Sequence, residues 1–181
     1  MTVRILLVRA VNVGGTAKLP MADFRTMLED LGAVRARTYI ASGNAILDLP
    51  DRAGPSEWAE FDRAAERELE SRFGFRREVI SRSLPELESA LADHPFTVAD
   101  PKLSYVAFLS AAPDQAGIER ANQLAVGGDE WAIRGTDLHL RFAAGMGKAT
   151  LNVDSLLKRL GVAGTARNLR TVTALIELAR G

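Results

Sequence analysis

The sequence contains no cysteine and only two histidines, and these shortages exclude several kinds of site. A chain without cysteine forms no disulfide, carries no thiolate nucleophile and offers no thiolate ligand to zinc or to an iron–sulfur cluster. His94 and His139 are too few for a histidine-rich metal site. We therefore expect the protein to use neither a metal nor a cofactor.

Long hydrophobic runs are also missing. A membrane-spanning helix needs about 20 consecutive apolar residues, and no stretch of the sequence approaches that length. The apolar start of the chain is interrupted by Arg9 and Asn12, so it lacks the pattern of a secretory signal peptide. We expect a cytoplasmic protein without a membrane partner, and nothing in the sequence indicates its oligomeric state.

Neither sign of charge is in excess, because 23 basic side chains balance 23 acidic ones. The charges are nevertheless unevenly spread: residues 141–181 contain seven basic and two acidic side chains, an excess of five. This excess is smaller than that of a typical nucleic-acid-binding domain. Most acidic side chains in the middle of the chain are expected to lie on the solvated face of a helix over residues 57–73.

A repeated order of strands and helices is present instead. The first half of the chain has the order β-α-β-β-α-β, with strands over 3–11, 34–40, 44–49 and 75–81 and helices over 20–31 and 57–73. The second half repeats this order with strands over 103–111, 130–135 and 137–143 and helices over 114–125 and 150–160, but a helix over 166–180 replaces its last strand. We therefore predict an α+β fold of two duplicated ferredoxin-like subdomains with an extra C-terminal helix.

The domain boundaries follow from this pattern. We expect the first ferredoxin-like subdomain to cover residues 1–82 and the second, with the C-terminal helix, to cover residues 103–181. Residues 83–102 connect them through a helix and a proline-containing segment.

Two glycine-containing loops should meet at one edge of the first sheet. In a ferredoxin-like unit the third strand runs antiparallel beside the first, so the end of the first strand lies next to the start of the third. This places "NVGG" (12–15) beside "ASGN" (41–44). Glycine and asparagine tolerate positive φ, which favours a tight turn in the second loop. The candidate ligand-binding residues of this edge are Asn12, Gly14, Gly15, Lys18, Ser42, Gly43 and Asn44.

The stretch "GMGKATLN" (145–152) is similar to a phosphate-binding loop. A nucleotide-hydrolysing loop has the pattern G-x-x-x-x-G-K-[ST], but Phe142 stands where its first glycine is required and Ala149 where its hydroxyl residue is. Two weaker interpretations remain: a plain strand-to-helix turn, or an anion site at the start of the following helix. The candidate anion ligands are Gly145, Gly147 and Lys148.

The stretch "GTARN" (164–168) is expected to open the last helix. Thr165 has the residue type of an N-cap, and Arg167 would lie near the helix N-terminus, where the helix dipole disfavours a cation. Such an arginine needs either an acidic partner or an anionic ligand. If this stretch faces residues 145–152, Lys148 and Arg167 converge on one anion. The candidate ligand residues of this stretch are Thr165, Arg167 and Asn168.

A polar row follows the expected strand over 137–143. Asp137, His139 and Arg141 alternate along it and therefore share one face. The row has the groups of an acid–base site, but the solvated face of a half-covered sheet is the more common arrangement. His94, which precedes Pro95, is expected to be a linker residue.

Four blocks of the sequence resemble the domain of unknown function 1697 family. They are "VNVGG" (11–15), "TYIASGN" (38–44), "GMGKA" (145–149) and "TARNLRTVT" (165–173). The chain departs from the family pattern at Ala149, where the family has serine, and at Leu169, where it has tryptophan. The resemblance implies a small bacterial α+β protein without an established activity, and it assigns no chemical role to these residues.

Three functions are compatible with these observations. The favoured one is a non-catalytic module that binds a phosphate-bearing ligand, a nucleotide or RNA, at the glycine-containing loop edges. The second is an enzyme that acts on a small anionic substrate through Lys148, Arg167 and His139. The third is a structural or interaction protein whose glycines only permit tight turns.

Overall fold

The structure is a computed structural model of the chain, and it describes residues 2–50 and 54–181. The chain divides into two compact units. The first unit consists of Met1–Leu87 and Leu175–Gly181, and the second consists of Glu88–Ala174. The boundaries fall inside two helices, α3 (Leu84–Ala92) and α6 (Leu169–Arg180). No helix in the described ranges is long and apolar enough to span a membrane.

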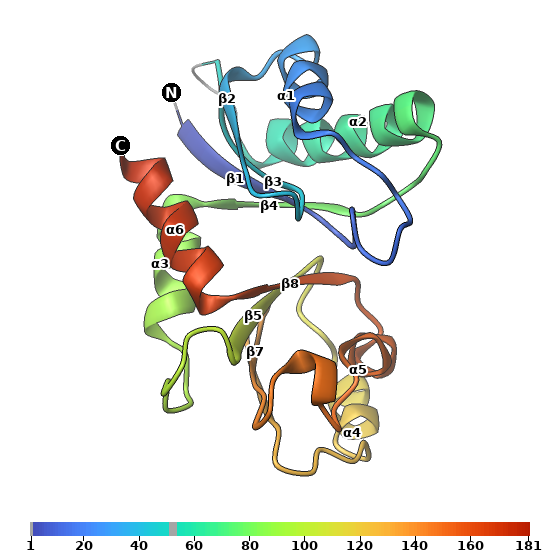
Figure 1. The fold of residues 1–181 in the computed structure, drawn as a ribbon, viewed down its shortest axis with the longest axis vertical. Coiled ribbons are helices and arrows are strands. Elements are labelled where there is room, and N and C mark those ends of the chain that lie inside the picture. The colour runs from blue at the N-terminus through green and yellow to red at the C-terminus, as the bar shows by residue number, and fades with distance from the viewer. Residues whose placement is uncertain (1, 51–53) are drawn as a thin grey trace. The chain divides into compact units, whose positions relative to one another are not determined.

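The first unit has the predicted order of strands and helices. Its elements are β1 (Thr2–Val8), α1 (Met21–Asp30), β2 (Val34–Tyr39), β3 (Asn44–Leu49), α2 (Pro55–Phe73) and β4 (Val79–Ser83). The strands form an antiparallel sheet in the order β2-β3-β1-β4. Helices α1 and α2 cover one face of this sheet (Figure 1). This is the ferredoxin-like arrangement.

Alternation along the strands decides which side chains form the core of the first unit. Leu6 of β1 and Leu47 of β3 pack with Phe24 of α1 and Trp58 of α2. Because successive strand residues point to opposite faces, Ile46 and its alternating neighbours lie on the face away from α1 and α2. Burial of large apolar side chains contributes about 1.5–3 kcal/mol each, so this layer is the main source of the unit's stability.

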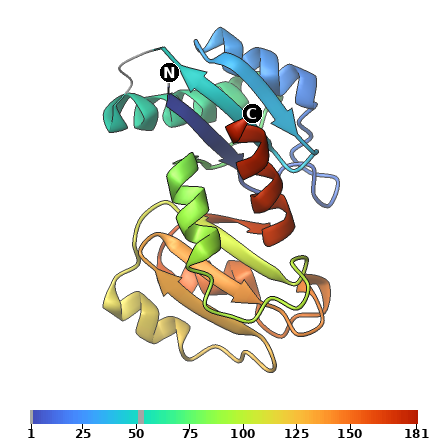
Figure 2. The ribbon, with the colours of Figure 1, turned by 90° about the vertical axis from the view of Figure 1, so that its left-hand side faces the viewer.

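The second unit repeats the arrangement. Its elements are β5 (Ser104–Leu109), α4 (Gln115–Ala121), β6 (Glu130–Arg134), β7 (Asp137–Arg141), the 3-10 turn η1 (Met146–Lys148), α5 (Val153–Leu160) and β8 (Gly164–Asn168). The strands pair antiparallel in the order β6-β7-β5-β8. Helices α4 and α5 lie side by side on one face of this sheet (Figures 1 and 2). The predicted α+β fold of two ferredoxin-like subdomains with an extra C-terminal helix is therefore confirmed.

One part of that prediction is wrong: the second unit does not lack its last strand. Gly164–Asn168 forms β8, which pairs with β5 from Tyr105↔Asn168 to Leu109↔Gly164. The C-terminal helix α6 begins only at Leu169, where the side chain of Asn168 accepts a hydrogen bond from the Thr171 amide (2.8 Å). Thr165 has the residue type of a helix N-cap but lies in a strand, because β5 pairs with β7 along one edge only and its other edge needs hydrogen-bond partners, which this stretch supplies.

Candidate functional site

The two glycine-containing loops of the first unit do meet, and Asn12 joins them. We call residues 9–20 and 40–43 together the loop edge. The Asn12 Nδ2 donates to the carbonyl of Ala41 (2.7 Å), which lies in the turn between β2 and β3. The same side chain closes its own loop, since it donates to the Leu19 carbonyl (2.9 Å) and accepts from the Leu19 amide (2.8 Å). The two loops therefore lie side by side, as the topology predicted, and the Asn12 side chain joins them.

The backbone of the loop edge is strained. Among the described residues, five non-glycine residues have positive φ, and four of them, Ala10, Asn12, Ala17 and Ile40, belong to the loop edge, with φ between 48° and 55°. A β-branched residue such as Ile40 is a genuine outlier in this region. Strained backbone of this kind clusters at functional sites, where the surrounding structure holds it in place.

Gly14 and Gly15 form the outermost part of the loop edge. Both adopt positive φ, +61° and +76°, and both are exposed. Among the described residues, their amides make no hydrogen bond, and the exposed Lys18 forms no ion pair. Consecutive amides in such a conformation form a shallow nest that favours an anion. The loop edge thus holds two available N–H donors and one cation.

The turn between β2 and β3 is held by hydrogen bonds of Ser42, Gly43 and Asn44. Asn44 is fully buried and donates from Nδ2 to the Tyr39 carbonyl (3.0 Å) and to the Ser42 Oγ (2.9 Å). The Gly43 carbonyl accepts from the Val8 amide (2.8 Å), and φ at Gly43 is +75°. These contacts hold the turn against the end of β1, so the three residues support the loop edge through its backbone.

The loop over residues 145–152 already contains an anion, the carboxylate of Asp129. This buried side chain accepts hydrogen bonds from the amides of Ala143 (3.0 Å), Thr150 (2.8 Å) and Leu151 (3.0 Å). Helix α5 begins at Val153 rather than at residue 150, and its N-terminus is capped internally, because the Asn152 Oδ1 accepts from the Ser155 amide (2.8 Å). The Thr150 and Leu151 amides thus have a partner within the chain, and the Lys148 and Ala149 amides donate to the carbonyls of Gly145 (3.0 Å) and Met146 (3.3 Å).

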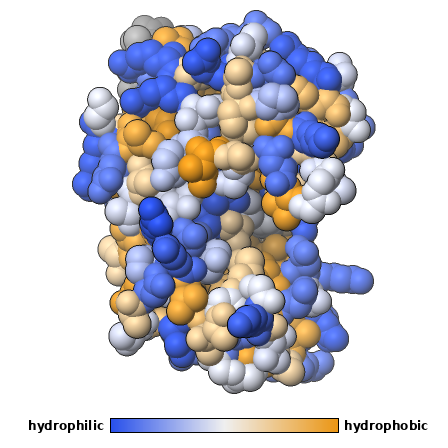
Figure 3. Space-filling model, in the orientation of Figure 1, coloured by the Kyte–Doolittle hydropathy of each residue, from blue (hydrophilic) through white to orange (hydrophobic). Residues whose placement is uncertain are grey.

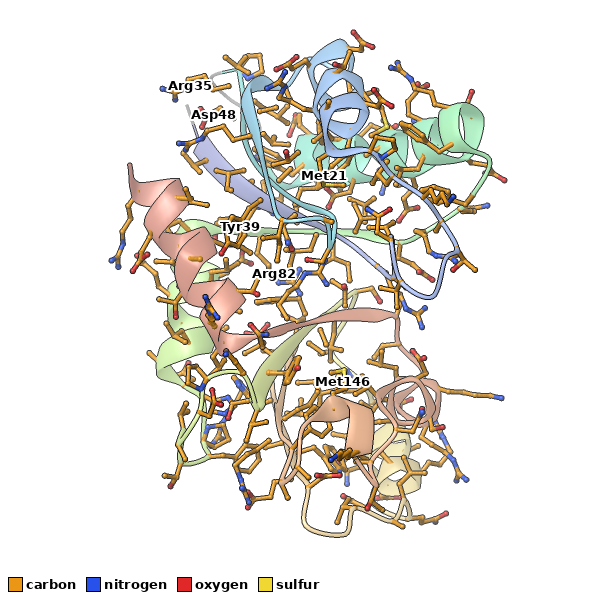
Figure 4. The ribbon with its side chains drawn as sticks, in the orientation of Figure 1. Met21, Arg35, Tyr39, Asp48, Arg82 and Met146 are labelled. Atoms are coloured by element: carbon orange, nitrogen blue, oxygen red, sulfur yellow. The ribbon has the colours of Figure 1, made fainter. Side chains whose placement is uncertain are left out.

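Lys148 and Arg167 do not form the predicted pair of cations at two helix N-termini. Lys148 ends η1 and is exposed, and Figure 4 shows the labelled Met146 in the same turn. Arg167 lies in β8, is 7% exposed and donates from Nη1 to the Thr165 Oγ1 (2.7 Å). Burial lowers the pKa of Arg167 to about 10. Arg167 is therefore a buried strand residue, and the N-terminus of α6 follows it at Leu169, where Asn168 already caps the Thr171 amide.

The polar row of β7 is not a solvated face. His139 is completely buried, and its Nδ1 lies 3.2 Å from the Nδ1 of His94, which was expected to be an ordinary linker residue. Burial first, and then electrostatic repulsion from the neighbouring His94 and Arg134, lower the pKa of His139 to about 4. The solvated interpretation is wrong because the segment after α3 returns over this face. A neutral pair in which one Nδ1 donates and the other accepts is the arrangement that fits the distance.

One polar cluster went unnoticed in the sequence. The Asp62 Oδ2 accepts from the amide (3.2 Å) and the hydroxyl (2.8 Å) of Ser81, while Arg4 donates to the same hydroxyl (3.3 Å) and lies 5.1 Å from the Trp58 ring. Burial raises the pKa of Asp62 to about 6. The available signal was position: Asp62 lies four residues after Trp58, on the border of the apolar stripe of α2. Its carboxylate ties α2 to β4.

The surface offers no broad apolar patch on the face shown in Figure 3, where hydrophobic residues form scattered groups among hydrophilic ones. A metal site also has no support in the described ranges, where no group of three or more potential ligands comes together. The loop edge therefore stands out through its conformation and its available donors.

Comparison with known proteins gives a family and a similar fold. The family model described as "Protein of unknown function (DUF1697)" matches residues 1–139, which include the loop edge. The solved structure of the conserved bacterial protein SP0830 from Streptococcus pneumoniae is similar, with a TM-score of 0.71 and 21% sequence identity over 98% of each chain. At this identity the likeness concerns the fold alone. No curated protein matches the chain.

Proposed function

Because this chain belongs to the DUF1697 family of proteins of unknown function, we propose a function from its own geometry: it is a non-catalytic module that binds a phosphate-bearing ligand at the loop edge. The observation that carries the proposal is the exposed Gly14–Gly15 pair, whose amides make no hydrogen bond within the described residues. Phosphate oxygens are strong acceptors, and successive backbone amides recognise them without a specialised side chain. Lys18 supplies a positive charge in the same loop.

Rigidity supports binding at this place. A flexible glycine loop would lose conformational entropy when it closes on a ligand, and that cost would reduce the affinity. Asn12 removes much of this cost because its three hydrogen bonds already fix both ends of the loop. The strained backbone at Ala10, Ala17 and Ile40 then holds the amides in their binding conformation before the ligand arrives.

The composition of the loop edge favours binding over catalysis. Its only ionisable side chains are Arg9 and Lys18, and Arg9 pairs with Glu78 (3.4 Å). The hydroxyl of Thr16 donates to the Val13 carbonyl (3.2 Å). General acid–base catalysis needs a group that titrates near neutral pH within reach of the substrate, and no such residue type occurs in these loops.

A free nucleotide fits better than RNA. RNA-recognition modules of this topology stack bases on aromatic side chains of the two central strands. The central strands here are β1, "TVRILLV", and β3, "NAILDL", and neither contains an aromatic residue. The phosphate group of a mononucleotide is therefore the part that the loop edge would recognise.

Titration of the isotope-labelled full chain with AMP, followed by amide NMR, tests the proposal. We expect saturable shifts at Gly14 and Gly15, and no shifts there with adenosine. Lys18→Gln should weaken AMP binding by roughly fivefold, which corresponds to about 1 kcal/mol. The matched control Lys102→Gln removes the same charge from an exposed lysine in the second unit and should leave the affinity unchanged.

Two results would count against this proposal in different ways. If AMP at about 10 mM, a concentration that detects even millimolar binding, leaves the Gly14 and Gly15 amides unmoved, the loop edge is only a turn. If a single-stranded oligoribonucleotide binds more tightly than AMP and shows a steep salt dependence, the ligand is RNA.

A further inference from the structure

The loop edge also carries exposed apolar side chains. Among the described residues five large apolar side chains are exposed, and the two most exposed are Val13 (62%) and Ile40 (49%). Both belong to the loop edge, one in each of its two loops. A single exposed apolar residue is ordinary on a protein surface, whereas neighbouring ones mark contact with a partner or a ligand. The position of this pair is therefore informative.

One hydrogen bond links the backbone around Val13 to the backbone around Ile40. Asn12, which directly precedes Val13, donates from Nδ2 to the carbonyl of Ala41, which directly follows Ile40 (2.7 Å). The Val13 carbonyl also accepts from the amide (3.2 Å) and from the hydroxyl (3.2 Å) of Thr16. Each apolar residue is thus one position away from the bond that joins the loops, and the backbone that carries Val13 is held in place.

Ile40 is an unfavourable residue for a position that only has to form a turn. Its φ is +49°, a left-handed conformation that strains a β-branched residue and that glycine or asparagine adopts readily. Its side chain is half exposed, so burial compensates for only part of the strain. An asparagine would form the same turn at a lower cost. Contact between the Ile40 side chain and a ligand explains both the strain and the exposure.

The apolar pair adjoins the amides of the proposed phosphate site. Val13 directly precedes Gly14 and Gly15, whose amides make no hydrogen bond in the described part of the chain. A ligand at the loop edge therefore meets amide donors and the charge of Lys18 next to aliphatic surface. This combination fits a phosphate ester with a flat apolar body. A sugar phosphate gains less, because hydroxyl groups cover its organic part and favour water over aliphatic side chains.

We propose that the loop edge selects nucleotides over other phosphate esters, because the base lies against Val13 and Ile40 while the phosphate meets the Gly14 and Gly15 amides. This inference rests on the proposed phosphate site. The base contact should increase the affinity about fivefold over that of the phosphate and sugar alone, which is too little to retain adenosine without its phosphate. Aliphatic side chains read the area of a base and not its hydrogen-bonding groups, so a purine should bind more tightly than a pyrimidine.

AMP and ribose 5-phosphate form the decisive pair of probes, because they differ only in the base. In NMR titrations of the full chain, both should shift the Gly14 and Gly15 amides, and AMP should bind about fivefold more tightly, with CMP between the two. AMP should also move the methyl resonances of Val13 and Ile40 upfield, because a purine ring shields a methyl group that lies over its face. Ribose 5-phosphate should leave these methyl resonances in place.

Two substitutions remove the apolar contacts with little change to the backbone. Asparagine in Ile40→Asn tolerates the left-handed conformation, and threonine in Val13→Thr keeps the branched shape of valine. Each should weaken AMP binding about two- to threefold and leave the affinity for ribose 5-phosphate unchanged. Val98→Thr is the matched control, since it makes the same change at an exposed valine of the second unit (42%) and should alter neither affinity.

The possible outcomes separate this inference from the function on which it rests. Equal affinities for AMP and ribose 5-phosphate, both with shifts at Gly14 and Gly15, would overturn the base contact and leave the phosphate site standing. A preference for AMP that survives both substitutions would place the base elsewhere and would also overturn the inference. If neither ligand moves the two glycine amides at about 10 mM, the phosphate site and the base contact are both refuted.

Discussion

Replacement of Gly43 by alanine should destabilise the first unit by about 2–5 kcal/mol, and the structure separates this cost into two parts. The first is conformational: Gly43 has φ +75°, and an L-residue in left-handed backbone costs about 1–2 kcal/mol. The second is steric. An added Cβ would lie 2.5 Å from the Val11 Cγ2 and 3.1 Å from the Val8 Cβ.

The steric part is substantial because neither neighbour can move easily. Val8 and Val11 are almost completely buried, and β-branched side chains have few alternative rotamers. Inserting a methyl group into a well-packed interior costs about 1–3 kcal/mol. The sum of the two parts gives the expected range.

Gly74→Ala is the matched control. Gly74 has nearly the same conformation, φ +73°, but a Cβ added there would have no neighbouring atom within 4 Å. It should therefore show only the conformational cost of about 1–2 kcal/mol. Urea unfolding followed by circular dichroism measures both variants under identical conditions.

A double-mutant cycle then isolates the steric part. In the Gly43→Ala background, Val11→Ala removes the Cγ2 atom that the new methyl group meets. The pair should be less destabilising than the sum of the single variants by about 1 kcal/mol or more. If Gly43→Ala costs no more than Gly74→Ala, or if the cycle shows no coupling, the close packing of the turn against Val11 is refuted.

Three further outcomes follow from buried polar groups. Burial raises the pKa of Asp62 to about 6, so the contribution of its protonated form to stability is full below pH 3.8 and is lost as the pH rises through 6. Asp62→Asn should therefore increase the free energy of unfolding at pH 8 by up to about 3 kcal/mol, seen as a higher melting temperature, and should change it little at pH 4. The pKa of His139 is lowered to about 4, so its contribution is full above pH 6.5 and is lost as the pH falls towards 4; His139→Gln should flatten the stability profile over this interval, and an unchanged slope would contradict the assignment. Asp129→Asn replaces one of the two carboxylate oxygens by an amino group that accepts no hydrogen bond, and should lower the free energy of unfolding by about 1–3 kcal/mol. Hydrogen exchange should become faster at the Thr150 and Leu151 amides, which donate to Asp129 in the native protein.

The sequence was sufficient for the fold where local pattern and topology agree. The alternating strands and the apolar helix stripes predicted both ferredoxin-like units, and chain topology alone placed Asn12 near Ala41, a contact that the structure confirms. The error at β8 has the opposite origin: Thr165 looks like an N-cap locally, whereas its strand conformation depends on β5, more than fifty residues earlier. Propensity at one stretch cannot reveal which distant edge is unpaired.

The polar details were beyond the sequence for a related reason. The roles of Asp62 and Asp129 depend on segments that approach them only in the folded chain, Ser81 in one case and the loop at Thr150 in the other. The residue type alone does not show whether an aspartate side chain is buried or solvated. Only the position of Asp62 beside an apolar stripe distinguished it from the many exposed acids of α2.

The carboxylate of Asp129 has a consequence for similar loops elsewhere. A side chain attached to the same chain acts as a tethered competitor, with an effective concentration in the millimolar range or above. A free phosphate would have to displace it from the Thr150 and Leu151 amides and leave a buried charge without partners. A glycine–lysine loop is therefore self-inhibited whenever a buried acid reaches its amides, and a search for phosphate loops gains specificity by asking where the nearest such acid lies.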